Sequence, residues 1–432
     1  MRRRGSVGLL SRRVRSAVFR LVLTGACALP AARVALAQAA FQTPPVLSAR
    51  ELLPPDMLAG SHFEVDDRVP TDGLLGHFTL RSGYGTFVAP GRELLRIRIA
   101  ELSAIQQLEA TSQSQEFLKA AGNAAARPVE AVVSLVTDPV QTIQGIPSGI
   151  SRFFDRIQLG AKRIAQAATD QTKTGEQRTQ ETAQRIGGVT ITALGFEQVR
   201  RQLAKELGVD PYTTNPVLSK KLTDTAWVGF SGRLGVNLLV SVFVPGSIAI
   251  SGLSFTHDLV YDTPAGDLIV LNRQKMLAMG ASEAQAQALI DNRWYSLSVL
   301  TGLVTELERM SGVAGRAEVL SLAATVTKEE EARFLAAAVQ VLAHLNATGV
   351  PIRRMMGPET VVGVTPDGML VVPAPVDYVS WTEKVGGFAM RTDLRATRRG
   401  IWLTGRMSGA AQQGFTARGW TLHDVTMPAG AR

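Results

Sequence analysis

The stretch LGVNLLVSVFVPGSIAISGLSFT, Leu234–Thr256, determines how the rest of this sequence is interpreted. It contains no charged residue, and amphipathic helical patterns lie on both sides of it. So much apolar surface is rarely left in water, so we expect the segment to be buried in protein or in lipid. Pro245 and Gly246 divide it into two pieces, each shorter than the about 20 residues that a spanning helix needs. The favoured interpretation is a buried apolar hairpin.

A membrane span over residues 234–256 is the alternative. Asn237 and several serines lower the hydrophobicity of the segment. If an export signal precedes it, the flank that carries Lys220, Lys221 and Arg233 would lie outside the cytoplasm. Such an orientation is opposite to the usual excess of positive charge on the cytoplasmic side. Both arguments favour burial within protein.

Residues 1–37 have the pattern of an export signal. They contain eight arginines, no acidic residue and a short apolar stretch at Leu21–Leu29. Ala35 and Ala37 are small residues at the positions that a signal peptidase reads, so the mature chain is predicted to start near Gln38. We therefore expect a protein of the bacterial envelope that is exported to the periplasm, by either the general secretory or the twin-arginine route.

Cysteine content and charge exclude several classes of function. Cys27 is the only cysteine and would be removed with the signal, so the mature chain has no disulfide, thiolate metal site or cysteine nucleophile. The formal charge of +9 also comes mainly from the signal, because the rest of the chain has 38 basic and 37 acidic residues. A nearly neutral chain after the signal argues against nucleic acid as a partner.

The patterns along the chain predict an α+β fold that is predominantly helical. The order of segments is a signal (1–37), a lead-in with a three-stranded β-meander (38–90), amphipathic helices (91–157), a polar linker (158–195), a helical core domain that contains the buried hairpin (196–346) and a small α/β module (347–432). In the meander, strands are expected at 62–69, 74–82 and 86–88, because apolar and polar residues alternate there.

Helix ends in the second half are predicted from capping patterns. Ser282 with Gln285, and Thr327 with Glu330, fit capping boxes. The expected helices cover residues 92–121, 196–207, 216–230, 283–291, 297–310, 315–325 and 328–346.

In the α/β module, the sequence predicts a hairpin followed by two helix–strand units. Two β-branched runs within 359–372 flank Thr365-Pro366-Asp367-Gly368, which is typical of a β-turn. Asp377 is expected to cap a helix that continues to Met390. Strands at 400–404 and 420–425 should enclose a helix over 409–418 that Ser408 caps.

Apolar residues recur at helical spacing through residues 129–154. The favoured interpretation is a pair of helices that face a protein core, because the polar face lacks the lysines and arginines of membrane-surface helices. Peripheral contact with a membrane through 129–154 is the alternative.

Two short segments contain candidate site residues. His257-Asp258, a histidine directly followed by a carboxylate, is the candidate catalytic pair. Gly405, Arg406 and Ser408 lie between a predicted strand and a predicted helix, where backbone amides and a guanidinium group could hold an anion. No zinc-protease pattern or phosphate-binding loop occurs, so no metal and no cofactor are predicted.

These observations favour a non-catalytic binding or scaffolding protein of the envelope, whose partner is an envelope component that the sequence does not identify. The alternatives are an envelope hydrolase with its site near His257-Asp258, and a membrane-anchored protein that spans the bilayer at 234–256.

Overall fold

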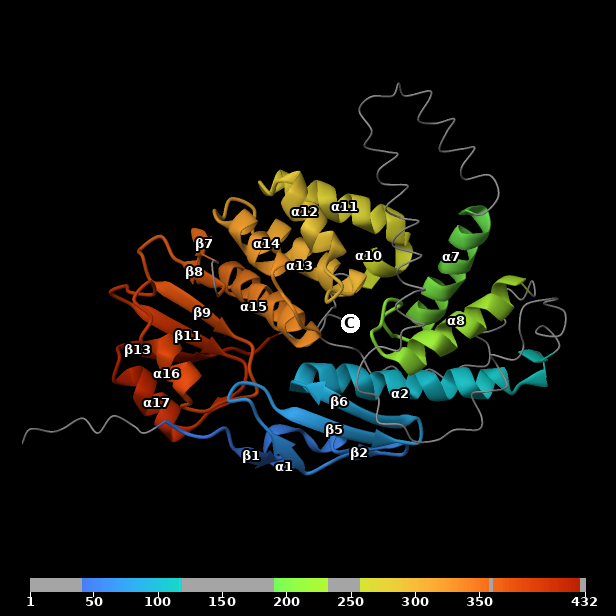
Figure 1. Ribbon diagram of the computed structural model, residues 1–432, viewed down its shortest axis with the longest axis horizontal. Helices are drawn as coiled ribbons and strands as arrows, with labels where there is room; N and C mark the ends of the chain where they lie inside the picture. Colours follow the sequence, from blue (N-terminus) through green and yellow to red (C-terminus); the bar gives the residue numbers. More distant parts are fainter. Residues whose placement is uncertain (1–40, 116, 119–189, 232–256, 357–359, 428–432) are drawn as a thin grey trace, which may run out of the picture. The chain divides into compact units, whose positions relative to one another are not determined.

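The computed structural model describes residues 41–115, 117–118, 190–231, 257–356 and 360–427 of the 432-residue chain (Figure 1). The described part is α+β and mostly helical, as the sequence predicts. The predicted signal, the segment 129–154, the apolar run 234–256 and the linker up to residue 189 lie outside the described residues. Among the described residues, no helix combines the length and the apolar composition that crossing a bilayer requires.

The N-terminal strands form an antiparallel sheet with one strand more than the three predicted. Its order is β2-β3-β5-β6, with β2 at Ala59–Gly60, β3 at Phe63–Val65, β5 at His77–Ser82 and β6 at Gly85–Pro90. The single strand predicted over 62–69 is instead two strands, β3 and β4 (Arg68–Pro70), and β4 pairs with β1 (Val46–Ser48). Asp66 lies at the break, where its carboxylate accepts two hydrogen bonds from Arg81 at 2.6 and 2.7 Å. Aspartate is unfavourable inside a β-strand. Asp66 instead lies between β3 and β4, where it forms an ion pair with Arg81.

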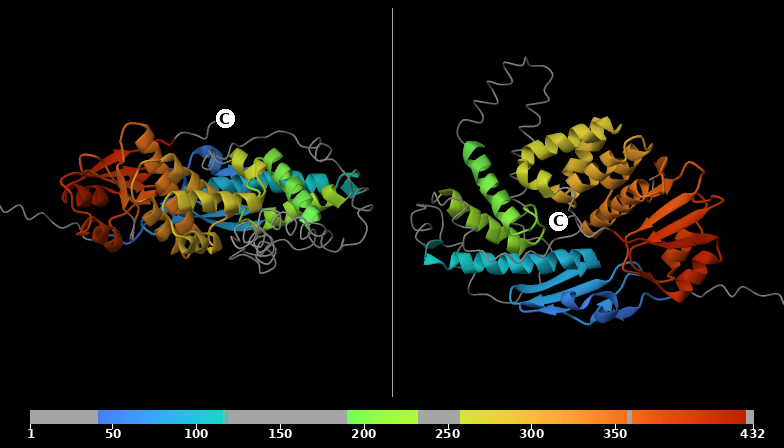
Figure 2. Two further views of the ribbon diagram at one scale, coloured as in Figure 1. Left: turned by 90° about the horizontal axis from the view of Figure 1, so that it is seen from above. Right: turned by 180° about the vertical axis from the view of Figure 1, so that it is seen from behind.

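Helix α2 (Arg92–Ser112) packs along this sheet, as Figures 1 and 2 show. Leu95, Leu102 and Ile105 recur at helical spacing and are almost fully buried, together with Phe78 and Leu80 of β5. This apolar face explains why the helix forms, and it confirms the predicted start at Arg92. The helix ends at Ser112, before the predicted end at Ala121.

Four helices of the described residues come first in the helical part. They are α7 (Thr190–Glu206), α8 (Pro216–Ser231), α10 (His257–Asp262) and α11 (Ala265–Ala278). Helix α7 starts inside the range predicted as linker. The next four helices are α12 (Glu283–Asp291), α13 (Leu297–Arg309), α14 (Arg316–Ala324) and α15 (Glu329–Ala347), within one residue of their predicted bounds.

One of the two predicted capping boxes forms. The Ser282 side chain accepts the Gln285 N–H group, and the Gln285 side chain accepts the Ser282 N–H group, which is the reciprocal pattern of a box. The prediction for Thr327 was wrong, because α15 has Lys328 at its N-cap and no side-chain cap. Thr327 instead donates its N–H and hydroxyl groups to Glu331, one residue beyond the predicted partner.

The C-terminal module is built on a five-stranded sheet in the order β13-β11-β9-β8-β7. The strands are β7 (Arg354–Met356), β8 (Val362–Val364), β9 (Leu370–Ala374), β11 (Arg399–Leu403) and β13 (Trp420–Asp424). The predicted hairpin is β8 with β9, and its turn is closed by a hydrogen bond from Gly368 N to Thr365 O of 3.0 Å. Strands β9, β11 and β13 are parallel, connected through α16 (Glu383–Ala389) and α17 (Gly409–Thr416).

Side-chain alternation gives this sheet two buried faces. Val371 and Trp402 belong to the core of the helical part, where α15 contacts β9. Val372, Ile401 and Leu403 point to the other face and share a second core with α16 and α17 (Figure 1). A sheet buried on both faces explains why β9 and β11 are almost continuously apolar.

Asp377 does not begin the helix predicted to follow it. Residues Tyr378–Val379 form a short strand, β10, which pairs in parallel with β12 (Arg406–Met407). Helix α16 begins later, where the Thr382 hydroxyl accepts the Val385 N–H group. The physical reason is that the backbone after Asp377 pairs with β12 and so cannot be helical. The Asp377 carboxylate instead accepts the N–H group of Arg92 at the start of α2.

Candidate functional site

The structure places the His257-Asp258 pair at the start of the short helix α10. Asp258 is exposed to solvent. One of its neighbours is Lys205 of α7, whose pKa is raised mainly by a hydrogen bond to Asp262 and further by the charge of Asp258. Within the described residues, no group of three or more histidine, cysteine, aspartate or glutamate side chains could hold a metal ion.

The loop that contains Gly405 and Arg406 runs against the connection that leads into β10. A side chain at Gly405 would collide with the carbonyl oxygens of Val376 and Asp377, so only glycine permits this approach. The Arg406 N–H group donates to Asp377 O at 2.9 Å, and the Arg406 side chain is exposed. The backbone amide that was expected to bind an anion is therefore already hydrogen-bonded within the protein.

Ser408 caps α17, as the sequence predicts. Its hydroxyl oxygen accepts the Ala411 N–H group at 3.1 Å, and the hydroxyl donates to Gln42 Oε1 at 2.8 Å. The Ser408 N–H group donates to Val379 O at 2.8 Å. Gly405, Arg406 and Ser408 thus lie together in the fold, but their backbone amides and the hydroxyl connect β10, β12, α17 and the N-terminal lead-in.

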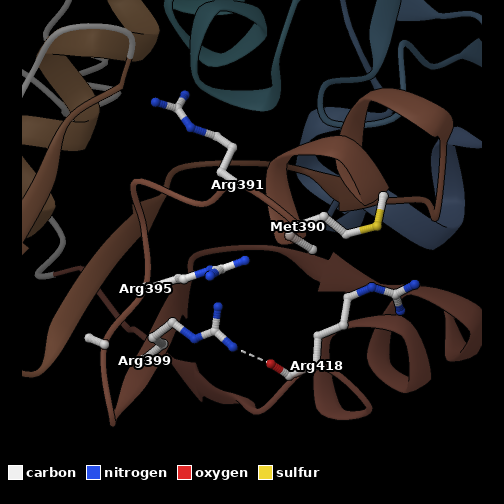
Figure 3. Close-up of a pocket in the computed structure, with 7 residues that line it drawn as sticks. Met390, Arg391, Arg395, Arg399 and Arg418 are labelled. Carbon is white, nitrogen blue, oxygen red and sulfur yellow. Dashed lines mark hydrogen bonds between the residues drawn. The ribbon is translucent and has the colours of Figure 1, made fainter. Parts of the chain in front are cut away.

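A different part of the same module gathers positive charge. A pocket of about 620 Å³ is lined by Arg391, Arg395, Arg399 and Arg418, together with Met390 and two alanines (Figure 3). We call it the arginine pocket. It lies where α16 ends, β11 begins and the chain leaves α17 for β13.

Two of these arginines are held in place by tryptophan rings. The Arg399 guanidinium carbon lies 4.6 Å from the centre of the Trp420 ring, and that of Arg418 lies 4.9 Å from the centre of the Trp381 ring. Arg399 donates to the carbonyl oxygen of Arg418, and Arg418 Nη1 donates to Gly414 O at 2.9 Å. Cation–π contact and helix-end carbonyls therefore fix both side chains.

Most of the hydrogen-bonding capacity of Arg399 and Arg418 remains free for a ligand. A guanidinium group has five N–H donors. In the described part of the chain, each of these two side chains uses one donor in a hydrogen bond, and neither forms an ion pair with a carboxylate. Their positive charges are therefore not neutralised there.

Arg391 has its own counter-ion. Its Nε and Nη2 atoms lie 3.0 and 2.6 Å from the two carboxylate oxygens of Asp393, which is a bidentate ion pair. This hydrogen bonding lowers the pKa of Asp393, so the aspartate stays charged at neutral pH. Figure 3 shows that the Arg391 side chain points away from Arg395 and Arg399.

Arg395 is the most accessible of the four. Its side chain is exposed, and in Figure 3 its guanidinium group extends in the same direction as that of Arg399. Among the described residues it has no hydrogen bond or ion pair. Arg395 and Arg399 therefore present two guanidinium groups to one pocket without a carboxylate partner in the described part of the chain, whereas the Arg418 guanidinium extends away from them in Figure 3.

The arginine pocket was not predicted from the sequence, although a local signal exists. The segment RTDLRATRR, Arg391–Arg399, contains four arginines and one aspartate. An excess of one charge in so short a segment predicts a basic patch. Arg418 could not be assigned to it from sequence, since it follows Arg399 by 19 residues and reaches the pocket only through the pairing of β11 with β13.

Comparison of the chain with protein-family models, curated proteins and solved structures gives no significant match. The chemistry of the site is therefore the basis on which function can be argued.

Proposed function

We propose that this protein is a non-catalytic binding protein whose arginine pocket holds a ligand with at least two negative charges, carried by phosphate or carboxylate groups. The observation that supports this proposal is the convergence of the Arg395 and Arg399 guanidinium groups on one pocket, which Arg418 also lines. Guanidinium groups match both kinds of anion because they form two parallel hydrogen bonds with a pair of oxygens.

Pre-organisation favours binding at this site. Arg399 and Arg418 are already held by Trp420 and Trp381, so little side-chain freedom is lost when a ligand binds. Arg395 is exposed and can close over a ligand from the loop. A pocket volume of about 620 Å³ lies within the range that small-molecule sites occupy.

The binding experiment is isothermal titration calorimetry with inorganic pyrophosphate, and with citrate as the carboxylate probe. Both titrations use a buffer of about 20 mM salt, because exposed charges are screened at higher ionic strength. We expect Arg395→Gln to weaken binding at least about tenfold, since a charge-assisted pair of hydrogen bonds is lost. Arg395 is exposed, so this variant should keep its fold.

Arg68→Gln is the matched control. Arg68 is an exposed arginine on β4, outside the arginine pocket, and its replacement removes the same charge from the protein. It should leave the affinity unchanged within about twofold, as expected for a distant surface charge. Equal weakening by both variants, or no binding of either probe to the wild type, would contradict the proposal.

A lipid headgroup and a soluble anion present the same chemistry to the pocket, and sedimentation with vesicles separates them. Vesicles that contain phosphatidylglycerol in phosphatidylcholine are compared with vesicles of phosphatidylcholine alone. Binding only to the anionic vesicles, lost in Arg395→Gln, identifies a lipid headgroup. Binding of pyrophosphate or citrate without sedimentation identifies a soluble ligand.

We also propose that the protein is exported and acts in the periplasm, with an envelope component as its ligand and no role for nucleic acid. The pattern of residues 1–37 and the nearly neutral charge of the remaining chain support this. N-terminal sequencing of protein recovered from the envelope should begin within a few residues of Gln38. Recovery of the chain with Met1 intact would contradict export with cleavage.

A further inference from the structure

A second cavity lies between the N-terminal part, the helical part and the C-terminal module. Its volume is about 910 Å³, and it shares no residue with the arginine pocket. Its walls come from α2, α13 and α15, with further residues from Pro375–Asp377 and from Val425–Met427 after β13. We call it the central cleft. This size fits a drug-sized organic molecule.

Helix α13 contributes one stripe of residues to the cleft. Val299, Gly302, Leu303 and Glu306 all line it and follow one another at three- and four-residue spacing. Gly302 lies one turn before Glu306 and adds no side chain to the cleft wall. The α13 stripe is thus apolar except at its last residue, Glu306.

Helix α15 contributes the facing stripe. Arg333, Ala337 and Gln340 recur at helical spacing, with the apolar side chains of Phe334 and Val341 beside them. The small Ala337 keeps the middle of the cleft open. The Arg333 guanidinium is neutralised at its own helix, since its Nε atom donates to Glu329 Oε1 at 2.8 Å.

Glu306 is a buried acid of the cleft on α13. Its side chain is only 9% exposed, and Arg309 Nη1 lies 3.4 Å from its Oε1 atom. Arg309 is itself 48% exposed, so its charge is shared with solvent. Burial raises the pKa of Glu306, and Arg309 only partly opposes this effect. A carboxylate in such surroundings is stabilised by a further cation.

Charged residues of both signs line the central cleft. Five carboxylates line it against three arginines, namely Asp56, Glu93, Glu306, Glu330 and Asp377 against Arg92, Arg96 and Arg333. The Arg92 Nη2 atom donates to Thr404 O at 3.2 Å, and Arg96 Nη1 lies 3.5 Å from Glu93 Oε2. These arginines have acceptors within the protein, and Glu330 likewise has Lys328 Nζ at 3.5 Å from its Oε1 atom. Glu306 is left with the long 3.4 Å contact to the half-exposed Arg309, so it is the acid that favours a ligand of positive charge.

We infer that the central cleft binds an organic cation with an apolar body, whose amine pairs with the Glu306 carboxylate while its body lies between α13 and α15. The apolar stripe of α13 and the small residues Gly302 and Ala337 supply the space and the contact surface. The inference concerns a site apart from the arginine pocket and does not depend on anion binding there.

The test is calorimetric titration of the full-length mature protein with three ten-carbon probes below their micelle concentrations. Decylamine is the cation, decanol the uncharged probe and decanoate the anion. We expect decylamine to bind at least about tenfold more tightly than decanol, and decanoate more weakly than both, since one ionic hydrogen bond separates the probes. Equal affinity for all three probes would overturn the inference.

Variants locate the binding. Glu306→Gln should reduce decylamine affinity to about that of decanol, because only the ionic contribution is removed. Ala337→Leu fills the cleft at a half-buried position and should weaken both decylamine and decanol. Glu318→Gln, at an exposed site on α14, is the matched control.

Thermal melts of each variant establish that it is folded before titration. If Glu306→Gln is unstable, Ala337→Leu still decides whether the probes occupy the cleft. Retention of full decylamine affinity in a folded Glu306→Gln protein, or in Ala337→Leu, would overturn the inference.

Discussion

The Asp377 carboxylate accepts the backbone N–H group of Gly76, with 2.9 Å between Oδ2 and the amide nitrogen. The same carboxylate accepts the N–H group of Arg92, the first residue of α2, at 3.1 and 3.2 Å. The N-cap residue of α2 is Gly91, which has no side chain to cap the helix. A buried aspartate of the C-terminal module therefore supplies the cap of a helix in the N-terminal part.

Replacement of Asp377 by alanine should destabilise the protein by at least about 2 kcal/mol, because the buried Gly76 N–H group and the partly buried Arg92 N–H group lose their acceptor. The free energy of unfolding in urea measures this loss. Asp424→Ala, at an exposed position on β13, is the control and should change stability by less than about 0.5 kcal/mol. Equal stability of the two variants would show that the cap contributes nothing.

A buried ion pair within α2 is hydrogen-bonded to the loop before α8. Glu101 is 1% exposed and accepts hydrogen bonds from Arg98 Nη1 at 2.7 Å, from Asn215 Nδ2 at 3.0 Å and from the Thr213 hydroxyl. Glu101→Ala leaves the buried Arg98 without its nearest carboxylate, so we expect a loss of about 3–5 kcal/mol. Urea unfolding measures it against Glu206→Ala, an exposed site on α7. A loss below 1 kcal/mol would contradict this expectation.

Glu329 should make stability depend on acid pH. Burial alone would raise its pKa, but the charges of Arg333 and Arg98 and a hydrogen bond from Thr214 bring the pKa below the ordinary value. The unfolded chain then binds the proton more readily, so the stabilisation is present above about pH 4.3 and is lost as pH falls through the folded-state pKa. Urea unfolding between about pH 6 and pH 3 should show a shallower decline for Glu329→Gln than for the wild type. Parallel declines would contradict the assignment.

Gly405 should tolerate no side chain. A methyl group there meets the carbonyl oxygens of Val376 and Asp377, so Gly405→Ala must displace backbone and should cost about 2 kcal/mol or more. Gly387 is the matched control, since a methyl group at this position of α16 meets nothing within 4 Å. Gly387→Ala should stabilise the protein slightly, by up to about 1 kcal/mol, through helix propensity. Thermal melts compare the two, and an unchanged melting temperature in Gly405→Ala would show that the loop adjusts freely.

Local sequence alone determined the elements whose hydrogen bonds close within a few residues. The box formed by Ser282 and Gln285, the Ser408 cap and the turn over Thr365–Gly368 follow from groups at most four positions apart. Such interactions need no other part of the chain, which explains why the bounds of α12–α15 and the hairpin of β8 with β9 were predicted closely.

Tertiary structure decided where charged side chains found their partners. By local rules Asp377 is a cap for the next helix, yet its acceptor oxygens serve amides 285 and 301 residues away, because strand β10 pairs with β12 and redirects the chain. In the same way Arg399 and Arg418 meet at one pocket only because β11 lies parallel to β13. Sequence fixes the charges of these residues, whereas packing of distant elements determines which groups they face.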